Sequence, residues 1–128
     1  MDIEQRKYVR FSVQDDTFAA LRLRSEFKKV GKVNDISIRG LAFSYLSETS
    51  EADADRHSSK VDIFLSGNGF HLSKVPCRIV YDIPDVTLYK GLFVKMARCG
   101  LHFGELIESQ SELLDFFIKN YTTEPLSS

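Results

Sequence analysis

The chain has 128 residues, 43% of them hydrophobic, and its 17 Lys and Arg against 18 Asp and Glu leave a net charge of -1. This length predicts a single domain, because a chain of this size buries about two-thirds of its unfolded surface around one core. The balanced charge excludes a broad polyanion-binding field, so it argues against a nonspecific DNA-binding protein and restricts any anion site to a local patch.

The first residues are charged and lack the apolar run of a signal peptide, and no segment approaches the roughly 18 apolar residues that span a bilayer. We therefore expect a cytoplasmic protein without membrane insertion. Both cysteines, Cys77 and Cys99, lie in apolar, strand-like runs without the spacing of a zinc site. We interpret them as reduced residues of the core.

Residues 1–13 show no convincing two-residue alternation and carry the basic side chains Arg6, Lys7 and Arg10. They are predicted to form a flexible N-terminal arm. Taken alone, this arm would be a solvated basic segment whose exposed ion pairs contribute only about 0–1 kcal/mol each.

Two antiparallel strands are predicted next, at 18–24 and 30–37, because apolar and polar side chains roughly alternate in both. Residues 25–28 would form the turn between them, although no Asn-Gly or Asp-Gly marks it. Gly40 would end the second strand with a backbone angle that other residues avoid, and 41–46 would form a third strand.

Residues 47–59 are polar and acidic, which predicts a solvated loop or a disordered segment. The strongest hairpin signal is Ser66-Gly67-Asn68-Gly69, between predicted strands at 61–65 and 70–75. Its glycines and asparagine tolerate the positive φ that tight hairpin turns require.

Pro76 is predicted to mark a bulge or bend, because proline cannot donate a ladder hydrogen bond. The strand would continue over 77–81, and residues 83–91 would form a loop. A final hairpin or bent strand is predicted from Leu92 through Ile107.

The spacing of the apolar residues changes at the carboxyl end. There, Ser109-Gln110-Ser111-Glu112 fits a capping box, which marks the start of a helix. Apolar residues then recur at helical spacing, which predicts an amphipathic helix. The residues of this apolar face are Leu113, Leu114, Phe117, Ile118 and Tyr121.

These elements predict a mainly all-β fold. It is a six- to seven-stranded antiparallel β-barrel over residues 14–107, closed to remove its edges and plugged by a C-terminal α-helix at 108–121. Residues 122–128 would form a tail.

The arm carries RxxxR, from Arg6 to Arg10, and Asp35-Ile36-Ser37-Ile38-Arg39-Gly40 gives DxSxxG. The order and spacing of these motifs resemble the signature of the PilZ family, whose members are bacterial receptors for cyclic di-GMP. The segment Cys99-Gly100-Leu101-His102-Phe103 is similar to a late strand of that family. The resemblance covers nearly the whole chain, to about Tyr121, and implies the same barrel.

The resemblance implies a ligand site formed by Arg6, Arg10, Asp35, Ser37 and Gly40. Arginine forks match phosphate and the Hoogsteen edge of guanine, and a carboxylate can accept from guanine N1-H and N2-H. A serine hydroxyl can contact phosphate or nearby backbone, and glycine permits close backbone approach. For the aspartate and the serine, the alternative is a purely local turn or hydroxyl-to-backbone bond.

Secondary candidates for the site are Gln5, Lys7 and Arg39. Gln5 lies where the family often has a residue that influences ligand stoichiometry, and Arg39 occupies a variable position of the motif. Tyr81 is interpreted as a packing residue, because an aromatic in a strand is more often core.

The histidines His57, His71 and His102 are scattered without metal-ligand spacing, so no metal site is expected. No nucleophile elbow, phosphate loop or Cys-His pair with an orienting acid is present. We therefore expect a protein that is not an enzyme, has no catalytic residues and uses no cofactor, with cyclic di-GMP as its ligand.

The leading hypothesis is a cyclic di-GMP receptor or adaptor whose N-terminal arm changes conformation on binding and so regulates an unidentified downstream protein. The resemblance implies motility, attachment or exopolysaccharide pathways. One alternative is a PilZ-like protein-interaction module that binds no nucleotide. Another is a small barrel that binds RNA, although no broad basic stripe follows the arginines.

Overall fold

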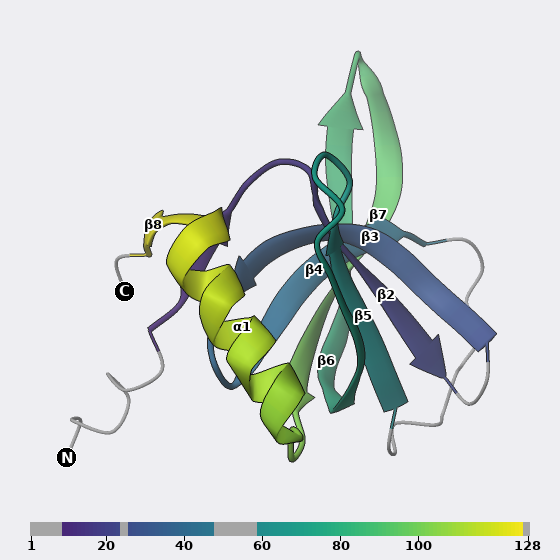
Figure 1. Ribbon diagram of the computed structural model, residues 1–128. Coiled ribbons are helices and arrows are strands. Elements are labelled where there is room, and N and C mark those ends of the chain that lie inside the picture. The colour runs from purple at the N-terminus through teal and green to yellow at the C-terminus, as the bar shows by residue number, and fades with distance from the viewer. Residues whose placement is uncertain (1–8, 24–25, 48–58, 127–128) are drawn as a thin grey trace, which may run out of the picture.

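The computed structural model describes residues 9–23, 26–47 and 59–126, with the side chains of residues 23 and 26–28 excepted. This part of the chain forms a β-structure with one helix near its carboxyl end (Figure 1). In chain order the elements are β1 (Phe11–Val13), β2 (Thr17–Leu23), β3 (Glu26–Ile36), β4 (Gly40–Leu46), β5 (Ser59–Leu65), β6 (His71–Tyr89), β7 (Leu92–Phe103), α1 (Glu108–Tyr121) and β8 (Thr122–Pro125).

The strands form an antiparallel sheet in the order β2-β5-β6-β7-β4-β3-β1-β8, and an additional pairing of β2 with β3 closes six of them into a ring. The closed ring with its C-terminal helix confirms the predicted fold class. The described part contains eight strands because the short strands β1 and β8 continue the sheet beyond β3.

Both ends of the described chain are in the sheet. Strand β1 pairs with β3 on one side and with β8 on the other, and Leu126 N donates to Arg10 O at 2.8 Å. An irregular arm over residues 11–13 and an irregular tail over 122–125 are therefore wrong. These strands are specified by backbone hydrogen bonds to distant neighbours, which leave no alternating pattern in so short a segment.

The core lies inside the ring and beneath α1. Its largest fully buried side chains include Phe43, Leu21 and Ile36 from the strands and Phe117 from the helix. Phe117 packs against Phe70 with ring centroids 5.3 Å apart and the ring planes tilted by 43°. Leu113, predicted for the buried face of the helix, is instead exposed, whereas both cysteines are free and buried as expected.

The helix begins one residue before the predicted capping box. Its N-cap is Ile107, and the Gln110 side chain accepts from Ile107 N at 3.2 Å. The same amide donates to the carbonyl oxygens of Ser73 and Lys74, which fixes the helix to β6. No helix among the described residues has the length and apolar character needed to cross a bilayer.

The predicted turn at 25–28 is wrong for residues 26–28, which belong to β3 and pair with the end of β2. The hairpin at 66–69 is confirmed, with Leu65 N donating to Phe70 O at 3.1 Å and Gly69 at φ 82°. Of the loop predicted at 47–59, residues 48–58 lie outside the described residues and Ser59 begins β5.

The bulge predicted at Pro76 lies slightly earlier, between Leu72 and Val75, where the register of β5 and β6 shifts. Lys74 adopts φ 56° there, and its backbone N donates to Asp62 Oδ1 at 3.1 Å. Strand β7 ends at Phe103 and does not reach Ile107.

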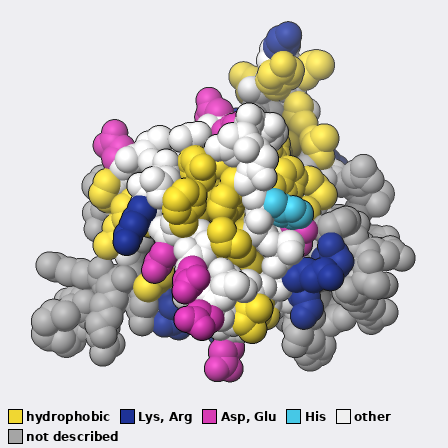
Figure 2. Space-filling view, in the orientation of Figure 1, with side chains coloured by type: hydrophobic (Ala, Val, Ile, Leu, Met, Phe, Trp, Pro, Cys, Tyr) yellow, Lys and Arg dark blue, Asp and Glu magenta, His cyan; other side chains and the backbone are white. Residues whose placement is uncertain are grey.

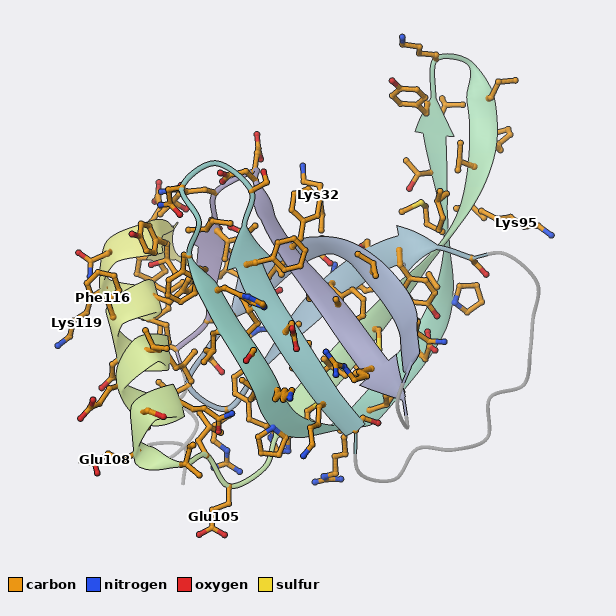
Figure 3. All side chains as sticks on the ribbon, turned by 45° about the vertical axis from the view of Figure 1, so that its right-hand side comes forward. Lys32, Lys95, Glu105, Glu108, Phe116 and Lys119 are labelled. Carbon is orange, nitrogen blue, oxygen red and sulfur yellow. The ribbon has the colours of Figure 1, made fainter. Side chains whose placement is uncertain are left out.

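The loop predicted at 83–91 is wrong. Strands β6 and β7 stay paired to Tyr89 and Leu92, and a two-residue turn of Lys90 and Gly91 joins them with φ of 50° and 81°. Positive φ at both positions matches the twist of a tight hairpin. The paired segment from Asp85 to Lys95, here called the finger, projects away from the ring (Figures 1 and 3).

Candidate functional site

The DxSxxG segment forms a tight turn between β3 and β4. Ser37 N donates to Gly40 O at 2.8 Å, and Ser37 Oγ accepts from Arg39 N at 3.0 Å. Asp35 and Ser37 are both buried. The turn therefore fixes a carboxylate and a hydroxyl at one end of the barrel.

Gly40 is required by a close approach of neighbouring backbone. A Cβ at this position would lie 2.0 Å from the carbonyl oxygen of Leu101 on β7. Its φ lies outside the left-handed region, so the predicted special backbone angle is wrong. The glycine allows β4 and β7 to pair tightly beside the turn.

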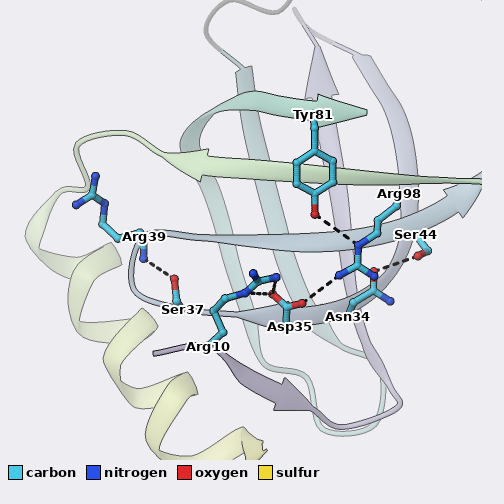
Figure 4. A network of polar contacts seen from close by, with 8 residues as sticks. All are labelled: Arg10, Asn34, Asp35, Ser37, Arg39, Ser44, Tyr81 and Arg98. Atoms are coloured by element: carbon cyan, nitrogen blue, oxygen red, sulfur yellow. Dashed lines mark hydrogen bonds and ion pairs between the residues drawn. The ribbon is translucent and has the colours of Figure 1, made fainter. Parts of the chain in front are cut away.

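Arg10 reaches Asp35 from the segment just before β1. Its Nε and Nη2 donate to Asp35 Oδ1 at 3.0 and 2.8 Å (Figure 4). Charge-assisted contacts of this kind are stronger than neutral hydrogen bonds. The side chain of Arg10 remains about half exposed, so one end of this ion pair is accessible to a ligand.

Arg98 of β7 holds the second oxygen of the same carboxylate. Its Nη2 lies 3.3 Å from Asp35 Oδ2, and its Nε lies 3.4 Å from the Tyr81 hydroxyl. The hydrogen bond to Tyr81 raises the pKa of Arg98. Partial burial opposes this increase, and the charges of Tyr81, Asp35 and Asp85 add smaller increases. Asp35 is thus held between two charged guanidinium groups.

Tyr81 of β6 packs its ring against Gly100, where a Cβ would meet the ring at 2.2 Å. This close contact agrees with the interpretation of Tyr81 as a packing residue. The same side chain also lines the pocket beside the turn, so it contributes to the surface that a ligand would meet.

These groups surround a pocket of about 320 Å³ at the turn. Basic side chains are frequent around it, and its lining includes Arg10, Asp35, Ser37, Arg39, Gly40, Val80, Tyr81 and His102. The pKa of His102 is lowered by its partial burial and by the neighbouring charges of Arg39 and Arg78. The pocket therefore has the electrostatic character of an anion site.

The structure brings Arg10, Asp35, Ser37, Gly40 and the secondary candidate Arg39 to one pocket. The other predicted site residues, Gln5, Arg6 and Lys7, lie outside the described residues.

Sequence reasoning missed Arg98 and His102 as residues of this region. A signal for Arg98 was present, because it is a charged residue within the otherwise apolar run from Met96 to Leu101. Nothing in the sequence pairs it with Asp35, because that contact depends on the ring placing β7 beside β4 and β3. Among the residues that the structure describes, no group of three or more metal-ligating side chains comes together.

No family model and no curated protein matches the sequence. Among solved structures, the chain is similar to the "PilZ domain with c-di-GMP of YcgR from Escherichia coli", with 14% identity, a TM-score of 0.68 and 91% of each chain covered. It is also similar to the K. pneumonia MrkH-c-di-GMP complex, with 14% identity, a TM-score of 0.66 and 90% of this chain covered. A structure of MrkH in its apo state gives 12% identity, the same TM-score and 88% coverage.

The chain spans about half the length of the two MrkH structures, covering 51% and 47% of them. At these identities, the likeness is one of fold. The chain has a PilZ-type fold, in agreement with the resemblance of its motifs.

Proposed function

From this PilZ-type fold and the pocket at its DxSxxG turn, we propose that the protein is a receptor for cyclic di-GMP. The observation that carries the proposal is the convergence of Arg10, Asp35, Ser37 and Gly40 on one basic pocket. Two of the similar structures, those of YcgR and MrkH, are described as containing c-di-GMP, which supports the same ligand class here.

In this proposal the ligand replaces part of the contact between Arg10 and Asp35. The fork of Arg10 turns to a phosphate or a guanine Hoogsteen edge, and Asp35 accepts from guanine N1-H and N2-H. Ser37 supplies a hydroxyl contact. Arg6, with Gln5, Lys7 and Arg39 as secondary contributors, completes the site.

Arg98 would hold Asp35 in place during this exchange. It contacts the oxygen that Arg10 does not use, so the carboxylate keeps one cationic partner when Arg10 moves away. Arg98 is therefore proposed as a positioning residue of the site.

The conformational change that accompanies binding is proposed to involve the chain up to Arg10. Residues 11–13 are part of the sheet, which restricts the responsive part of the arm to what precedes them. The resulting change of surface would regulate a downstream protein. A protein partner is favoured over DNA because the net charge of the chain is -1. No catalytic step and no cofactor is part of this proposal.

One observation favours the alternative of a protein-interaction module that binds no nucleotide. Both oxygens of Asp35 already have cationic partners within the chain, which is what a purely structural network requires. In a receptor, a guanine would replace Arg10 at this carboxylate. In a module that binds no nucleotide, the contact between Arg10 and Asp35 would persist.

Isothermal titration with cyclic di-GMP, combined with light scattering to follow mass, tests the proposal. Binding should be saturable, and Arg10→Ala should lose about 1–3 kcal/mol, equivalent to roughly 5- to 150-fold in affinity. Lys119→Ala removes a charge from the exposed face of α1 (Figure 3) and should leave affinity unchanged. Cyclic di-AMP should bind far more weakly, because adenine has no N1-H or N2-H to donate to Asp35.

Absence of saturable binding by folded protein would support the interaction module instead. Equal affinity of Arg10→Ala and the unaltered chain would mean that any binding occurs at another site.

A further inference from the structure

The finger exposes large apolar side chains to solvent. Phe93 is 78% exposed, Leu92 69% and Leu88 62%, and Val86 and Tyr89 are exposed to a similar degree. Figure 2 shows this as a hydrophobic projection at the upper right with a basic side chain at its end. Contiguous apolar surface of this kind marks an interaction site more often than a free surface.

Every residue of the finger is exposed except Val94, which is half-buried. Leu88 lies opposite Phe93 and Tyr89 lies opposite Leu92, so the two faces of the ribbon both carry apolar pairs. Among the described strands, β5 pairs with β6 only as far as Cys77, and β4 pairs with β7 only from Met96. An isolated two-stranded ribbon is marginally stable in water, so a partner that covers it is expected to stabilise it.

A groove of about 540 Å³ lies at the root of the finger. Its lining includes Leu46 and Met96, which pair with each other where β7 leaves the ring, and it extends over Phe18 and Val30. Val30 and Leu46 are themselves exposed. The groove thus offers apolar side chains and enough volume to receive the tip of an apolar hairpin.

The charges at the two ends of the finger differ. Lys90 is the charged residue at the tip, whereas Asp85 and Lys95 both lie near the root. Asp15 and Lys32, whose charged groups lie 3.9 Å apart, stand at the groove. Two fingers in antiparallel orientation would place each Lys90 near Asp85 and Asp15 of the other copy. A parallel orientation would bring the two Lys90 side chains together.

We propose that two copies of this chain associate about a twofold axis, with Leu92 and Phe93 of each finger seated in the groove of the other copy. Antiparallel fingers bring each tip to the opposite root, which is where the groove lies. The contact is self-complementary, as a twofold interface requires. A stable interface buries roughly 800 Å² per partner, and here each copy contributes both a finger and a groove.

A lipid surface fits these observations less well. Beyond Lys95, whose carbonyl oxygen accepts from Ser47 N, no described strand pairs with either edge of the finger, and hydrocarbon cannot satisfy such backbone groups. A second copy, by contrast, supplies both an apolar groove and acidic side chains.

Sedimentation velocity over a range of concentrations tests the association. The unaltered chain should form a dimer, and both Phe93→Asp in the finger and Leu46→Asp in the groove should weaken dimerisation by at least about tenfold. Phe116→Asp, at an exposed apolar position of α1, should leave the dimer intact. Circular dichroism verifies that each variant is folded. A monomer at all concentrations, or a dimer that Phe93→Asp does not affect, would overturn the proposal.

Cross-linking tests the geometry. The native thiols are buried, so oxidation of a mixture of Phe93→Cys and Leu46→Cys chains should link the two variants to each other. Links formed only between Phe93→Cys chains would show tip-to-tip contact and contradict the proposed seat. Cosedimentation of a monomeric chain with phosphatidylglycerol vesicles, lost in Phe93→Asp, would assign the finger to a lipid surface instead.

The association does not depend on the nucleotide. Ligand titration of the Phe93→Asp monomer therefore tests the receptor function separately, and either proposal can fail while the other stands.

Discussion

Strands β6 and β7 build two regions of opposite character. Within the ring they carry Tyr81, Arg98 and His102, whose polar groups line or support the pocket. Beyond the ring, the same ladder carries Leu88 and Phe93, which are exposed on the finger. The backbone pairing is continuous between the two regions, but only the first has strands β4 and β5 on its flanks.

This contrast shows that the strands on either side of β6 and β7, more than the pairing of β6 with β7 itself, determine whether a side chain is paired or exposed. A polar group in the ring finds fixed partners, as Asp35 does between two guanidinium groups. An apolar group on the finger is exposed to solvent. Similar substitutions in the ring and in the finger should therefore differ clearly in their effects.

Thiol reactivity should separate the regions most strongly. Burial raises the pKa of Cys77 to about 12, with a smaller opposing effect of Lys60. A cysteine introduced on the finger by Leu88→Cys should have a pKa near the ordinary value of about 8.5. Iodoacetamide should modify it more than about a thousandfold faster than Cys77, as followed by intact mass at low protein concentration. Comparable rates would show that the ring opens readily.

Adding one methyl group should reduce the free energy of unfolding more in the ring than in the finger. Gly40→Ala places a Cβ against the Leu101 carbonyl and should reduce the free energy of unfolding by about 3 kcal/mol. Gly91→Ala, in the turn of the finger, meets no atom within 4 Å but must adopt φ 81°, so it should cost about 1 kcal/mol. Urea denaturation gives both values, and an equal cost would mean that β4 and β7 can separate beside the turn.

Removal of a charge should affect ligand binding only in the ring. If the receptor function is correct, Arg98→Gln leaves Asp35 without its second partner and should lower the affinity for cyclic di-GMP about fivefold, or roughly 1 kcal/mol. Lys95→Gln, on the finger (Figure 3), should bind as the unaltered chain does. Titration calorimetry measures both, and an unchanged affinity in Arg98→Gln would remove its positioning role.

The smallest expected effect concerns pH. The lowered pKa of His102 means that protonation favours the unfolded chain, so stability should decline as pH falls through about 6.5. A bound phosphate would favour the protonated ring, so the affinity for cyclic di-GMP should rise about threefold between pH of about 8 and about 6. His102→Gln should abolish both trends, whereas His71→Gln should retain them. A pH dependence that persists in His102→Gln would assign it to another group.

The sequence was sufficient to predict the ring and the helix, because their side chains alternate or recur with a clear period. Three features could not be predicted, because they depend on contacts that leave no local pattern in the sequence. Strands β1 and β8 are defined by their pairing with each other, and the turn of the finger uses Lys90-Gly91 in place of a stronger signal such as Asn-Gly. The contact of Arg98 with Asp35 joins residues 63 positions apart.

The motif was sufficient to predict that three residues of the candidate pocket lie together. Asp35, Ser37 and Gly40 are close in sequence, and a tight turn keeps them together in space. Arg10 could be assigned only through a known signature, since nothing local shows that it reaches this turn.

The pairing of β1 with β8 has a mechanical consequence. Arg10 O accepts from Leu126 N, and β1 pairs with β8, so the backbone that carries Arg10 of the pocket is joined to the segment that leaves α1. A displacement of the Arg10 backbone would therefore be expected to shift β8 and the carboxyl end of α1 as well. Deleting β8 would consequently alter the position of Arg10 in the pocket without changing any side chain that lines it.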